Sequence, residues 1–230
     1  MMCTVSVVIP AFNAERYLAE AVRSGLNQSS PPFEIIVVDD GSTDATGALA
    51  QAFGPPVRLV TIPHGGIGAA RNAGLAAATG NYIALLDADD TWEPGKLEAQ
   101  LSVLGADGGA AGVFCHVVQF VSPELSVAER RQLAVAEAPM AGVIPSALLA
   151  RREVFGRVGP FDTALRVGEF IDWHARATAA GLRFAMLDVV LVGRRLHTTN
   201  TGRRERDSRA DYLRVIKSAL DRRREGAAGV

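Results

Sequence analysis

Short apolar, β-branched segments alternate with helix-patterned segments over the first hundred residues, and this alternation restricts the fold more than any other feature of the sequence. Each apolar segment ends in Pro or Asp, as strands that are covered on both faces commonly do. These segments are "TVSVVIP" (4–10), "FEIIVVDD" (33–40), "VRLVTIP" (57–63) and "YIALLDADD" (82–90). Strands that alternate with helices predict an α/β protein with a mostly parallel, doubly wound sheet flanked by helices.

The intervening segments have the spacing and end signals of helices. Asn13 is placed to cap the helix of "NAERYLAEAVRSGLNQ", and Ser42 or Thr43 could cap the next one. The third segment, "GGIGAARNAGLAAATG" (65–80), combines a glycine-rich loop with a small-residue helix. A tight turn and close packing on the sheet could by themselves explain its glycines.

Composition limits the classes of protein to consider. The chain has 230 residues, of which 48% are hydrophobic, enough for the core of one ordinary domain. Cys3 and Cys115 have neither a metal-binding nor a redox spacing, which argues against a disulfide framework. The first residues lack the basic segment and the long apolar segment of a signal peptide, and no apolar segment reaches membrane-spanning length. We therefore expect a soluble cytoplasmic protein.

Charge is distributed unevenly along the chain. Lys and Arg minus Asp and Glu give 5 − 12 = −7 for residues 1–120 and 11 − 5 = +6 for residues 194–230. An acidic front suits a metal-dependent site for a phosphorylated substrate, and a basic tail suits phosphates or an anionic membrane surface. A solvated surface would explain the tail equally well.

Polar residues gather where the predicted strands end. Asp39, Asp87 and Asp89 follow apolar segments, and the ligand crevice of a parallel sheet lies outside the carboxyl ends of its strands. Asp-Asp-Gly-Ser at 39–42 is also good turn chemistry, but several acidic strand ends in one half-chain favour a binding site. Carboxylates spaced like Asp87 and Asp89 suit Mn²⁺ or Mg²⁺ together with substrate phosphates. A Walker-type loop is absent.

Taken in order, these segments resemble a known family. "VSVVIPAFNAERYLAEAVRSGLNQ", "EIIVVDDGSTD" and "GGIGAARNAGLAAATGNYIALLDADD" look like the signatures of the family 2 glycosyltransferases, inverting nucleotide-sugar enzymes of the GT-A fold. The resemblance is dense over residues 4–98, weak over 99–150, and returns at "GPFDTALRVGEFIDWHARATAAGLRF". It implies a GT-A domain over residues 1–202, with a nucleotide-sugar binding half (1–98) and an acceptor and catalytic half (99–202). A basic C-terminal helix and tail (203–230) would follow.

The resemblance also implies roles for individual residues in donor binding. Pro10, Ala11 and Phe12 would line the nucleobase pocket, and Asp39 would accept a hydrogen bond from a uracil-type N–H. Arg71 matches the basic residue near the base carbonyl. Asp87 and Asp89 match the D-x-D motif of the family, which implies that Asp89 contacts the metal and that Asp87 acts on the ribose or through water. Asp90 could equally be a helix cap.

The catalytic motif departs from the family pattern. An inverting transfer needs a general base, usually the Asp of a Glu-Asp pair in EDxDLWLR, whereas this chain has "EFIDWHAR" with Phe170 at that position. Glu169 and Asp172 remain as candidate catalytic residues, with Asp172 slightly favoured. In the plain structural interpretation, Glu169 stabilises the helix N-terminus and Asp172 pairs with Arg176.

The end of the chain offers further candidates. His197 lies where GT-A enzymes often place a late metal-binding histidine, and Arg194 and Arg195 could reach a diphosphate. His64 and His174 have no supporting neighbours in the sequence and are expected to be structural. The "ADYLRVIKSALDRRRE" segment has the pattern of a docking helix with a basic end.

These features predict a glycosyltransferase that moves a sugar from a nucleoside diphosphate donor, with UDP favoured, to a hydroxyl acceptor in polysaccharide or glycoconjugate biosynthesis. The acceptor could be a saccharide, a lipid-linked molecule or a small molecule, the basic tail could contact a membrane, and nucleic acid is not expected. A sugar nucleotidyltransferase is less favoured, because it would carry its glycine-rich loop directly after the first strand, where this chain has "PAFNAERYL". A non-catalytic nucleotide-sugar binding module is the other alternative, because Phe170 cannot accept a proton.

Overall fold

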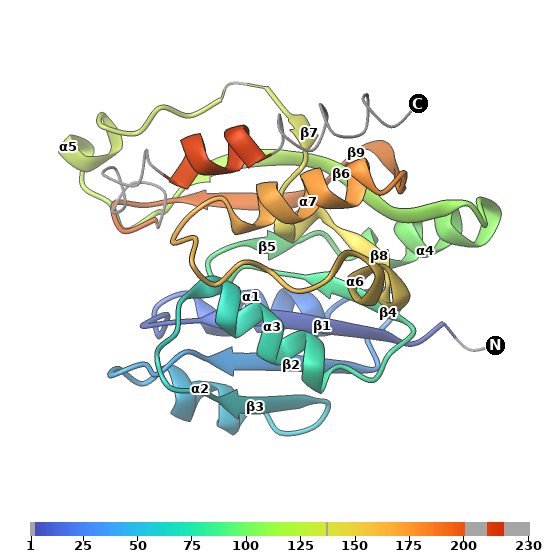
Figure 1. Cartoon of the computed structure of the whole chain (residues 1–230). Helices are drawn as coiled ribbons and strands as arrows, with labels where there is room; N and C mark the ends of the chain where they lie inside the picture. The colour runs from blue at the N-terminus through green and yellow to red at the C-terminus, as the bar shows by residue number, and fades with distance from the viewer. Residues whose placement is uncertain (1–2, 137, 201–210, 219–230) are drawn as a thin grey trace.

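A parallel sheet with helices on both faces forms the first half of the protein (Figure 1). The structure is a computed structural model that describes residues 3–136, 138–200 and 211–218. The strands are β1 (Val5–Ala11), β2 (Glu34–Asp39), β3 (Val57–Thr61) and β4 (Tyr82–Leu85), and the helices are α1 (Leu18–Leu26), α2 (Thr46–Ala52) and α3 (Ile67–Ala77). The strand order β3-β2-β1-β4 is parallel throughout, so the order reverses beside β1. Such a reversal opens a crevice at the carboxyl ends of the strands.

The second half extends the same sheet in mixed orientation. Its elements are β5 (Thr91–Trp92), α4 (Lys96–Ala106), β6 (Ala110–Val121), α5 (Val127–Arg130), β7 (Met140–Gly142), the 3₁₀ helix η1 (Pro145–Ala147), β8 (Leu149–Arg151), α6 (Arg152–Val158), α7 (Glu169–Ala179) and β9 (Arg183–Leu196). β8 is antiparallel to both β4 and β6, whereas the long strands β6 and β9 are parallel to each other. Because β8 pairs with β4, the segments 1–98 and 99–202 share one sheet. The predicted mostly parallel order thus holds throughout the first half, and in the second half it holds for β6 and β9.

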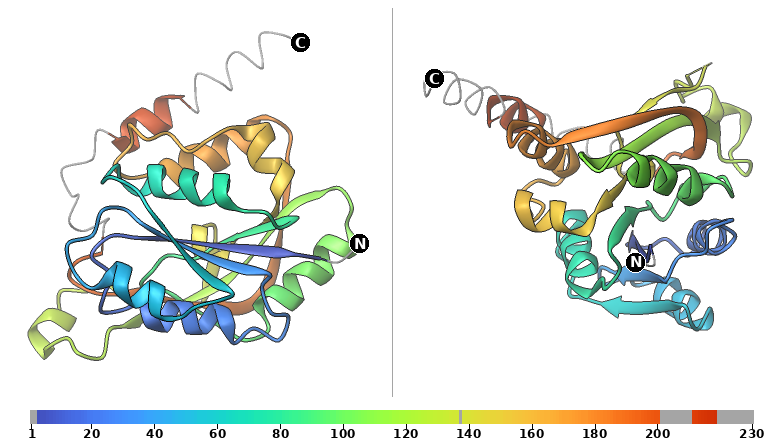
Figure 2. Two further views of the ribbon diagram at one scale, coloured as in Figure 1. Left: turned by 90° about the horizontal axis from the view of Figure 1, so that it is seen from below. Right: turned by 90° about the vertical axis from the view of Figure 1, so that its right-hand side faces the viewer.

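The core lies between the sheet and two layers of helices. Every residue of β1 and β2 is buried, as expected for strands covered on both faces. Figure 2 shows α1, α2 and α4 on one face of the sheet and α3, α6 and α7 on the other. α3 packs so closely that a Cβ added at Gly74 would lie 2.2 Å from Cγ1 of Val8. Gly74 therefore does have the packing role that the sequence suggested.

One charged side chain lies inside this core. Lys96, the first residue of α4, has no exposed surface, and its Nζ donates to Oε1 of Gln100 at 2.8 Å. The same Nζ lies 4.1 Å from the centroid of the Trp92 ring. The Nε2 of Gln100 donates to the carbonyls of Val113 and Ala147, so the lysine is held in a satisfied polar network.

Three predicted helix caps were wrong. Neither Ser42 nor Thr43 caps α2, because that helix has Ala45 at its N-cap without a side-chain bond. α1 begins at Leu18 and has Tyr17 at its N-cap without a side-chain bond, whereas Asn13 has a positive φ of 48° and lies in the loop after β1. Asp90 caps no helix either, because α4 has Gly95 at its N-cap. Asn13 instead binds the loop after β2, and Asp90 binds Ser146 of η1 and Arg195 of β9, as described below.

Residues 211–218 form a helix that docks beside the loop before α7. The carboxylate of Asp211 accepts a hydrogen bond from the backbone N–H of Arg166 at 3.0 Å, and Val215 is buried. Tyr212 and Val215 lie within 4 Å of a Cβ built on Gly168. Most of the predicted basic tail, 203–230, lies outside the described residues. None of the described helices has the length and apolar character needed to span a membrane.

Candidate functional site

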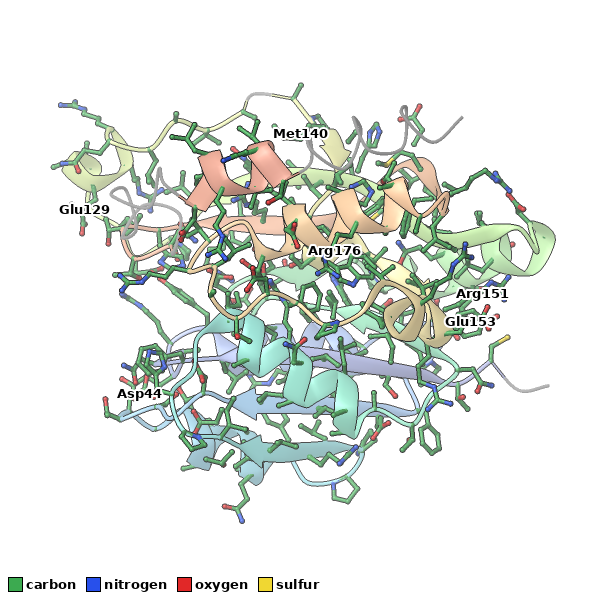
Figure 3. The ribbon with its side chains drawn as sticks, viewed as in Figure 1. Asp44, Glu129, Met140, Arg151, Glu153 and Arg176 are labelled. Carbon is green, nitrogen blue, oxygen red and sulfur yellow. The ribbon has the colours of Figure 1, made fainter. Side chains whose placement is uncertain are left out.

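The loops that follow β1 and β2 are tied together at the carboxyl edge of the sheet. The side chain of Asn13 accepts from the N–H of Thr43 at 2.8 Å, and the N–H of Asn13 donates to Ser42 Oγ at 2.9 Å. Asp44 accepts from the N–H of Glu15 at 3.2 Å. In Figure 3, Asp44 marks this edge at the left, and Arg151 and Glu153 lie at the opposite edge. Asn13 therefore cross-links two loops of the candidate site.

Asp39 lies at the end of β2, beside the end of β1. It pairs in register with Ala11, is buried, and its Oδ1 accepts from the N–H of Ser42 at 2.9 Å. Pro10 and Ala11 are buried next to it. The structure thus brings together Pro10, Ala11 and Asp39, three residues to which the sequence assigned the nucleobase.

Asp40 anchors the glycine-rich loop. Its Oδ1 accepts from the N–H of Gly65 at 2.7 Å, and its Oδ2 accepts from the N–H of Gly66 at 2.9 Å. Gly41 has a φ of +72°, and a Cβ there would lie 2.9 Å from the backbone nitrogen of His64. The chain therefore needs glycine at this crossing, and the loop is fixed against the end of β2.

His64, which the sequence interpretation treated as structural, lies beside the candidate site. Its ring stacks on that of Phe12 with a centroid distance of 4.1 Å and an interplanar angle of 21°. Its Nδ1 lies 2.9 Å from Oδ2 of Asp40. Phe12 is 39% exposed, so the two rings form a partly open aromatic surface beside Asp39 and Asp40. Only the position of His64 between a strand end and the glycine-rich loop could have suggested this role.

Arg71 bridges the two halves of the chain. Its guanidinium is 1% exposed, donates to Asp87 Oδ1 at 2.7 Å through Nη2, and pairs with Glu169 through Nη1. Asp87 follows β4 and Glu169 is the first residue of α7. The ion pairs of Arg71 in the described structure are with these two carboxylates, so its assignment to the nucleobase stays a prediction.

Asp89 and His197 form a pair at the end of β4 and β9. His197 Nε2 lies 2.9 Å from Asp89 Oδ2, and Asn200 Nδ2 donates to the same oxygen at 3.1 Å. His197 Nδ1 lies 2.8 Å from the hydroxyl oxygen of Thr199. The structure therefore brings together the two residues that the sequence proposed as metal ligands, 108 positions apart.

This pair fits a divalent cation in its donor chemistry. One carboxylate and one imidazole suit Mn²⁺ best when diphosphate oxygens and waters supply the remaining positions. Among the described residues there is no group of three or more His, Cys, Asp or Glu side chains that could hold an ion by itself. Any metal at Asp89 would therefore depend on oxygen ligands from a substrate.

Asp90 is a buried support for the turn that carries Asp87 and Asp89. Its Oδ2 accepts from Ser146 Oγ at 2.7 Å, and its Oδ1 accepts from the N–H of Arg195 at 3.0 Å. Burial, and then the negative charges of Asp89 and Asp87, raise the pKa of Asp90 well above its ordinary value. Ser146 Oγ also accepts from the N–H of Asp87 at 3.1 Å. Ser146 lies in the 99–150 segment, where the sequence showed no motif.

The catalytic motif of α7 divides into a buried face and a paired face. Phe170 is 4% exposed, and its ring lies 6.3 Å from that of Phe114 and 6.0 Å from that of Trp173. The position that carries the usual Asp therefore faces the core. An Asp placed there would bury a charge among aromatic rings, so it would be a poor way to restore activity.

Asp172 pairs with Arg176 one turn along the helix. Its Oδ2 accepts from Arg176 Nε at 2.8 Å, and the guanidinium also donates to the carbonyls of Val158 and Pro160 at 2.7 Å. This is the helix pair of the plain structural interpretation. Of the two candidate bases, Glu169 is the one connected through Arg71 to the end of β4.

The diphosphate role suggested for Arg195 was wrong. Its side chain is 3% exposed and its Nε donates to the carbonyl of Asp89 at 2.9 Å, whereas the neighbouring Arg194 is exposed. A buried guanidinium that is already bonded to protein groups has no free face for a phosphate.

Comparison with known sequences gives one family and several relatives. The profile described as glycosyl transferase family 2 matches residues 6–159. Succinoglycan biosynthesis protein ExoO of Rhizobium meliloti is 36% identical over 79% of this chain and 58% of its own length. The putative teichuronic acid biosynthesis glycosyltransferase TuaG of Bacillus subtilis is 40% identical over 44% of this chain and 41% of its own length. The chain thus spans about half of the length of these two curated relatives.

Solved structures resemble the fold over nearly the whole chain. S. aureus TarS 1–349 in complex with UDP gives a TM-score of 0.71 at 19% identity, covering 95% of this chain and 65% of that chain. The complex of TarS 1–349 with UDP-GlcNAc gives a TM-score of 0.70 at 19% identity, covering 86% of this chain and 60% of that chain. At this level of identity the likeness concerns the fold.

Proposed function

Because this chain belongs to glycosyl transferase family 2, we propose that it transfers a sugar with inversion from a nucleoside diphosphate donor to a hydroxyl acceptor, with a divalent metal. The donor is a UDP-sugar in this proposal. The names of the two relatives above refer to succinoglycan and teichuronic acid biosynthesis, which supports a role in making a polysaccharide or glycoconjugate.

The observation that carries the proposal is the grouping of carboxylates at the carboxyl edge of the sheet. Asp87 and Asp89 follow β4, Asp39 ends β2, and the strand order reverses between these two strands at β1. His197 reaches Asp89 from the end of β9. A ligand lying along this edge would meet an aromatic surface at one end and an acidic, histidine-containing pair at the other, which suits a nucleoside diphosphate.

The nucleoside would occupy the end formed by the loops after β1 and β2. Pro10, Ala11 and Phe12 would line the base, and Asp39 would accept from its N–H group. The side chain of Asp87, 28% exposed, would accept from ribose hydroxyls while it remains paired with Arg71. The complexes of TarS with UDP and UDP-GlcNAc support the choice of uracil, since that protein has the same fold.

The diphosphate would lie at Asp89 and His197, which would hold Mn²⁺ or Mg²⁺. When bound, such an ion takes up charge that develops on the leaving diphosphate. The chain's own part is to hold Asp89 in place. Asn200 donates to Asp89 Oδ2, and the hydrogen bond between Ser146 and Asp90 fixes the turn after β4. These contacts orient the carboxylate before any ligand arrives, which lowers the cost of ordering it on binding.

Glu169 is the base in this proposal, ahead of Asp172. The base must take the proton of the acceptor hydroxyl as that oxygen attacks the anomeric carbon on the side opposite the diphosphate. Glu169 begins α7 and shares Arg71 with Asp87, which supports a position beside the donor. The ion pair uses Oε1, and Oε2 is the oxygen that would receive the proton. Asp172 is instead tied by Arg176 to the loop after α6.

The test is turnover of a panel of nucleotide sugars with Mn²⁺, Mg²⁺ or chelator, for the wild type, Asp89→Ala and Asp188→Ala. Asp188 is a matched control, because its side chain is 93% exposed and lies in the middle of β9, away from the carboxyl end that carries His197. We expect release of nucleoside diphosphate from one UDP-sugar in the wild type and the control, and its loss in Asp89→Ala. Equal activity in Asp89→Ala, with and without chelator, would refute the metal assignment.

A second candidate function is a nucleotide-sugar binding module without turnover. It is favoured by one observation: Phe170 faces the core, and both neighbouring carboxylates, Glu169 and Asp172, are paired with arginines. A module of this kind would bind a UDP-sugar in calorimetry but release no UDP with any acceptor. The turnover panel, run beside calorimetry on the same preparation, separates the two functions.

A further inference from the structure

Arg195 joins three separate parts of the fold near the candidate metal pair. Its backbone N–H donates to Asp90 Oδ1 at 3.0 Å, and its Nε donates to the carbonyl of Asp89 at 2.9 Å. Its Nη2 pairs with the carboxylate of Glu20 on α1. One side chain on β9 therefore fixes both the turn after β4 and the first helix.

The guanidinium of Arg195 also lies between two aromatic rings. Its Cζ is 4.9 Å from the centroid of Tyr17 and 4.6 Å from that of Phe120. Contacts of this kind are stronger when they are desolvated, and Arg195 is 3% exposed. The Tyr17 ring in turn lies 4.7 Å from the ring of His197.

These contacts reach both members of the Asp89–His197 pair. Arg195 holds Asp89 through the backbone carbonyl of that residue. His197 follows Arg195 by two residues in the chain, and its ring lies beside that of Tyr17, which contacts Arg195. The hydroxyl of Tyr17 is fixed too, since it pairs with Glu124, whose Oε2 accepts from Ser122 at 2.7 Å. The arrangement thus has few ways to move without breaking several contacts.

We infer that Arg195 is a positioning residue, which sets the relative position of Asp89 and His197 without touching the substrate. The inference rests on the proposed function for its consequence, namely that the pair holds a metal together with a diphosphate. Arginine is required because its planar fork donates in several fixed directions while stacking on rings, and lysine cannot reproduce this geometry. Replacing a residue that hydrogen-bonds to metal ligands without touching the metal typically lowers metal affinity by roughly 10- to 100-fold.

The first measurement needs no metal. The imidazole ¹⁵N signals of His197, identified by their loss in His197→Gln, are compared between the wild type, Arg195→Lys and Arg183→Lys. Arg183 is the matched control, because it lies at the other end of the same strand in an exposed pair with Asp107. We expect the His197 signals to shift in Arg195→Lys and to stay in place in Arg183→Lys. Unchanged His197 signals in a folded Arg195→Lys protein would overturn the inference.

The second measurement is the factor by which Mn²⁺ tightens UDP binding, determined by calorimetry with the metal and with chelator. Arg195→Lys should reduce this factor about tenfold or more, while UDP affinity in chelator changes little. If wild-type UDP affinity is the same with Mn²⁺ and with chelator, the proposed metal site fails, whereas the spectra still decide the positioning role.

A second variant covers the case in which Arg195→Lys does not fold. Glu20→Gln keeps Arg195 and removes the charge that anchors its Nη2, at a side chain that is 59% exposed. We expect a smaller shift of the His197 signals in the same direction. If those signals and the Mn²⁺ factor both match the wild type, the inference is wrong.

Discussion

Replacing Lys96 by methionine should remove a rise in the free energy of unfolding that the wild type shows above about pH 8. Burial lowers the pKa of Lys96 from 10.5 to about 8. The folded state therefore holds the proton less tightly than the unfolded state. Below pH 8 both states are protonated, and the full cost of the buried charge is present. Between pH 8 and 10.5 only the unfolded state keeps its proton, so stability rises with pH.

The size of this effect follows from the difference between the two pKa values. A difference of about 2.5 between 10.5 and about 8 corresponds to roughly 3 kcal/mol, at about 1.36 kcal/mol for each pH unit. The ring of Trp92 and the Oε1 of Gln100 both favour the protonated lysine, and a desolvated cation–π contact contributes about 2 kcal/mol. We therefore expect a change of about 1–3 kcal/mol between pH 7 and 10.5.

Cys115 must be separated from Lys96 in the upper part of this range. Burial raises the pKa of the Cys115 thiol above 9.0, while Lys96 lowers it. Its folded state therefore binds the proton more tightly, so its contribution to stability is present below pH 9 and decreases above it. A Cys115→Ala background removes this opposing contribution.

The assay is urea unfolding of wild type and Lys96→Met at half-unit steps from pH 7 to 10, in both backgrounds. The stability of Lys96→Met minus that of the wild type should fall as pH rises above 8, since only the wild type gains stability from losing the lysine proton. A difference that stays constant over this range would refute the assignment of a lowered lysine pKa. The absolute difference at pH 7 is less informative, because the methionine also loses the bonds to Gln100 and Trp92.

Three further predictions concern the site and its surroundings. Glu169→Gln should lower kcat by a factor of about 10² to 10⁴, with UDP affinity nearly unchanged. Asp172→Asn should instead act on stability: it weakens the ion pair with Arg176, and each kcal/mol lost should lower the melting temperature by about 2–4 °C. Steady-state kinetics and thermal melts measure the two effects, and full turnover in Glu169→Gln would mean that the base lies elsewhere. Asp39→Ala should lose UDP affinity and the preference for UDP over a non-uracil diphosphate in calorimetry; an unchanged preference argues against its role at the base. Deleting residues 203–230 removes the buried side chain of Val215 and should cost about 2 kcal/mol in urea unfolding. Binding of the truncated chain to anionic vesicles should fall at low salt and match the full chain at high salt, because exposed charges are screened over about 8 Å at physiological ionic strength.

The parallel first half could be predicted from the sequence because its signals are local. A β-branched run followed by Asp defines a strand and its end, and parallel strands bring their ends to one edge. Asp39, Asp87 and Asp89 therefore fell at the same edge as expected. The second half has no such local signal. β6 and β9 pair over a separation of about seventy residues, and the 99–150 segment is rich in Ala and Gly.

The supporting residues of the site could not be predicted for the same reason. Ser146 and Asp90 meet across 56 positions, and nothing in the sequence around Ser146 differs from an ordinary turn. His64 stacks on Phe12 only because Asp40 holds the glycine-rich loop in place. Arg195 was interpreted as a phosphate-binding residue because it is charged and lies close to His197 in the sequence. Nothing in the sequence indicates that its side chain is buried. Contacts of this kind are set by tertiary packing and not by local propensity.

The buried bridge from Arg71 to Asp87 and Glu169 limits how acceptor preference could be changed by exchanging parts between relatives. A chimaera that kept residues 1–98 and took its remaining sequence from another protein would join Arg71 to a foreign α7. If that helix began without a carboxylate, the guanidinium would keep only one of its two ion pairs in a nearly dry environment, and loss of one partner from a buried pair costs about 3–5 kcal/mol. Grafts should therefore carry an acidic residue at the first position of α7, whatever acceptor they are meant to bring.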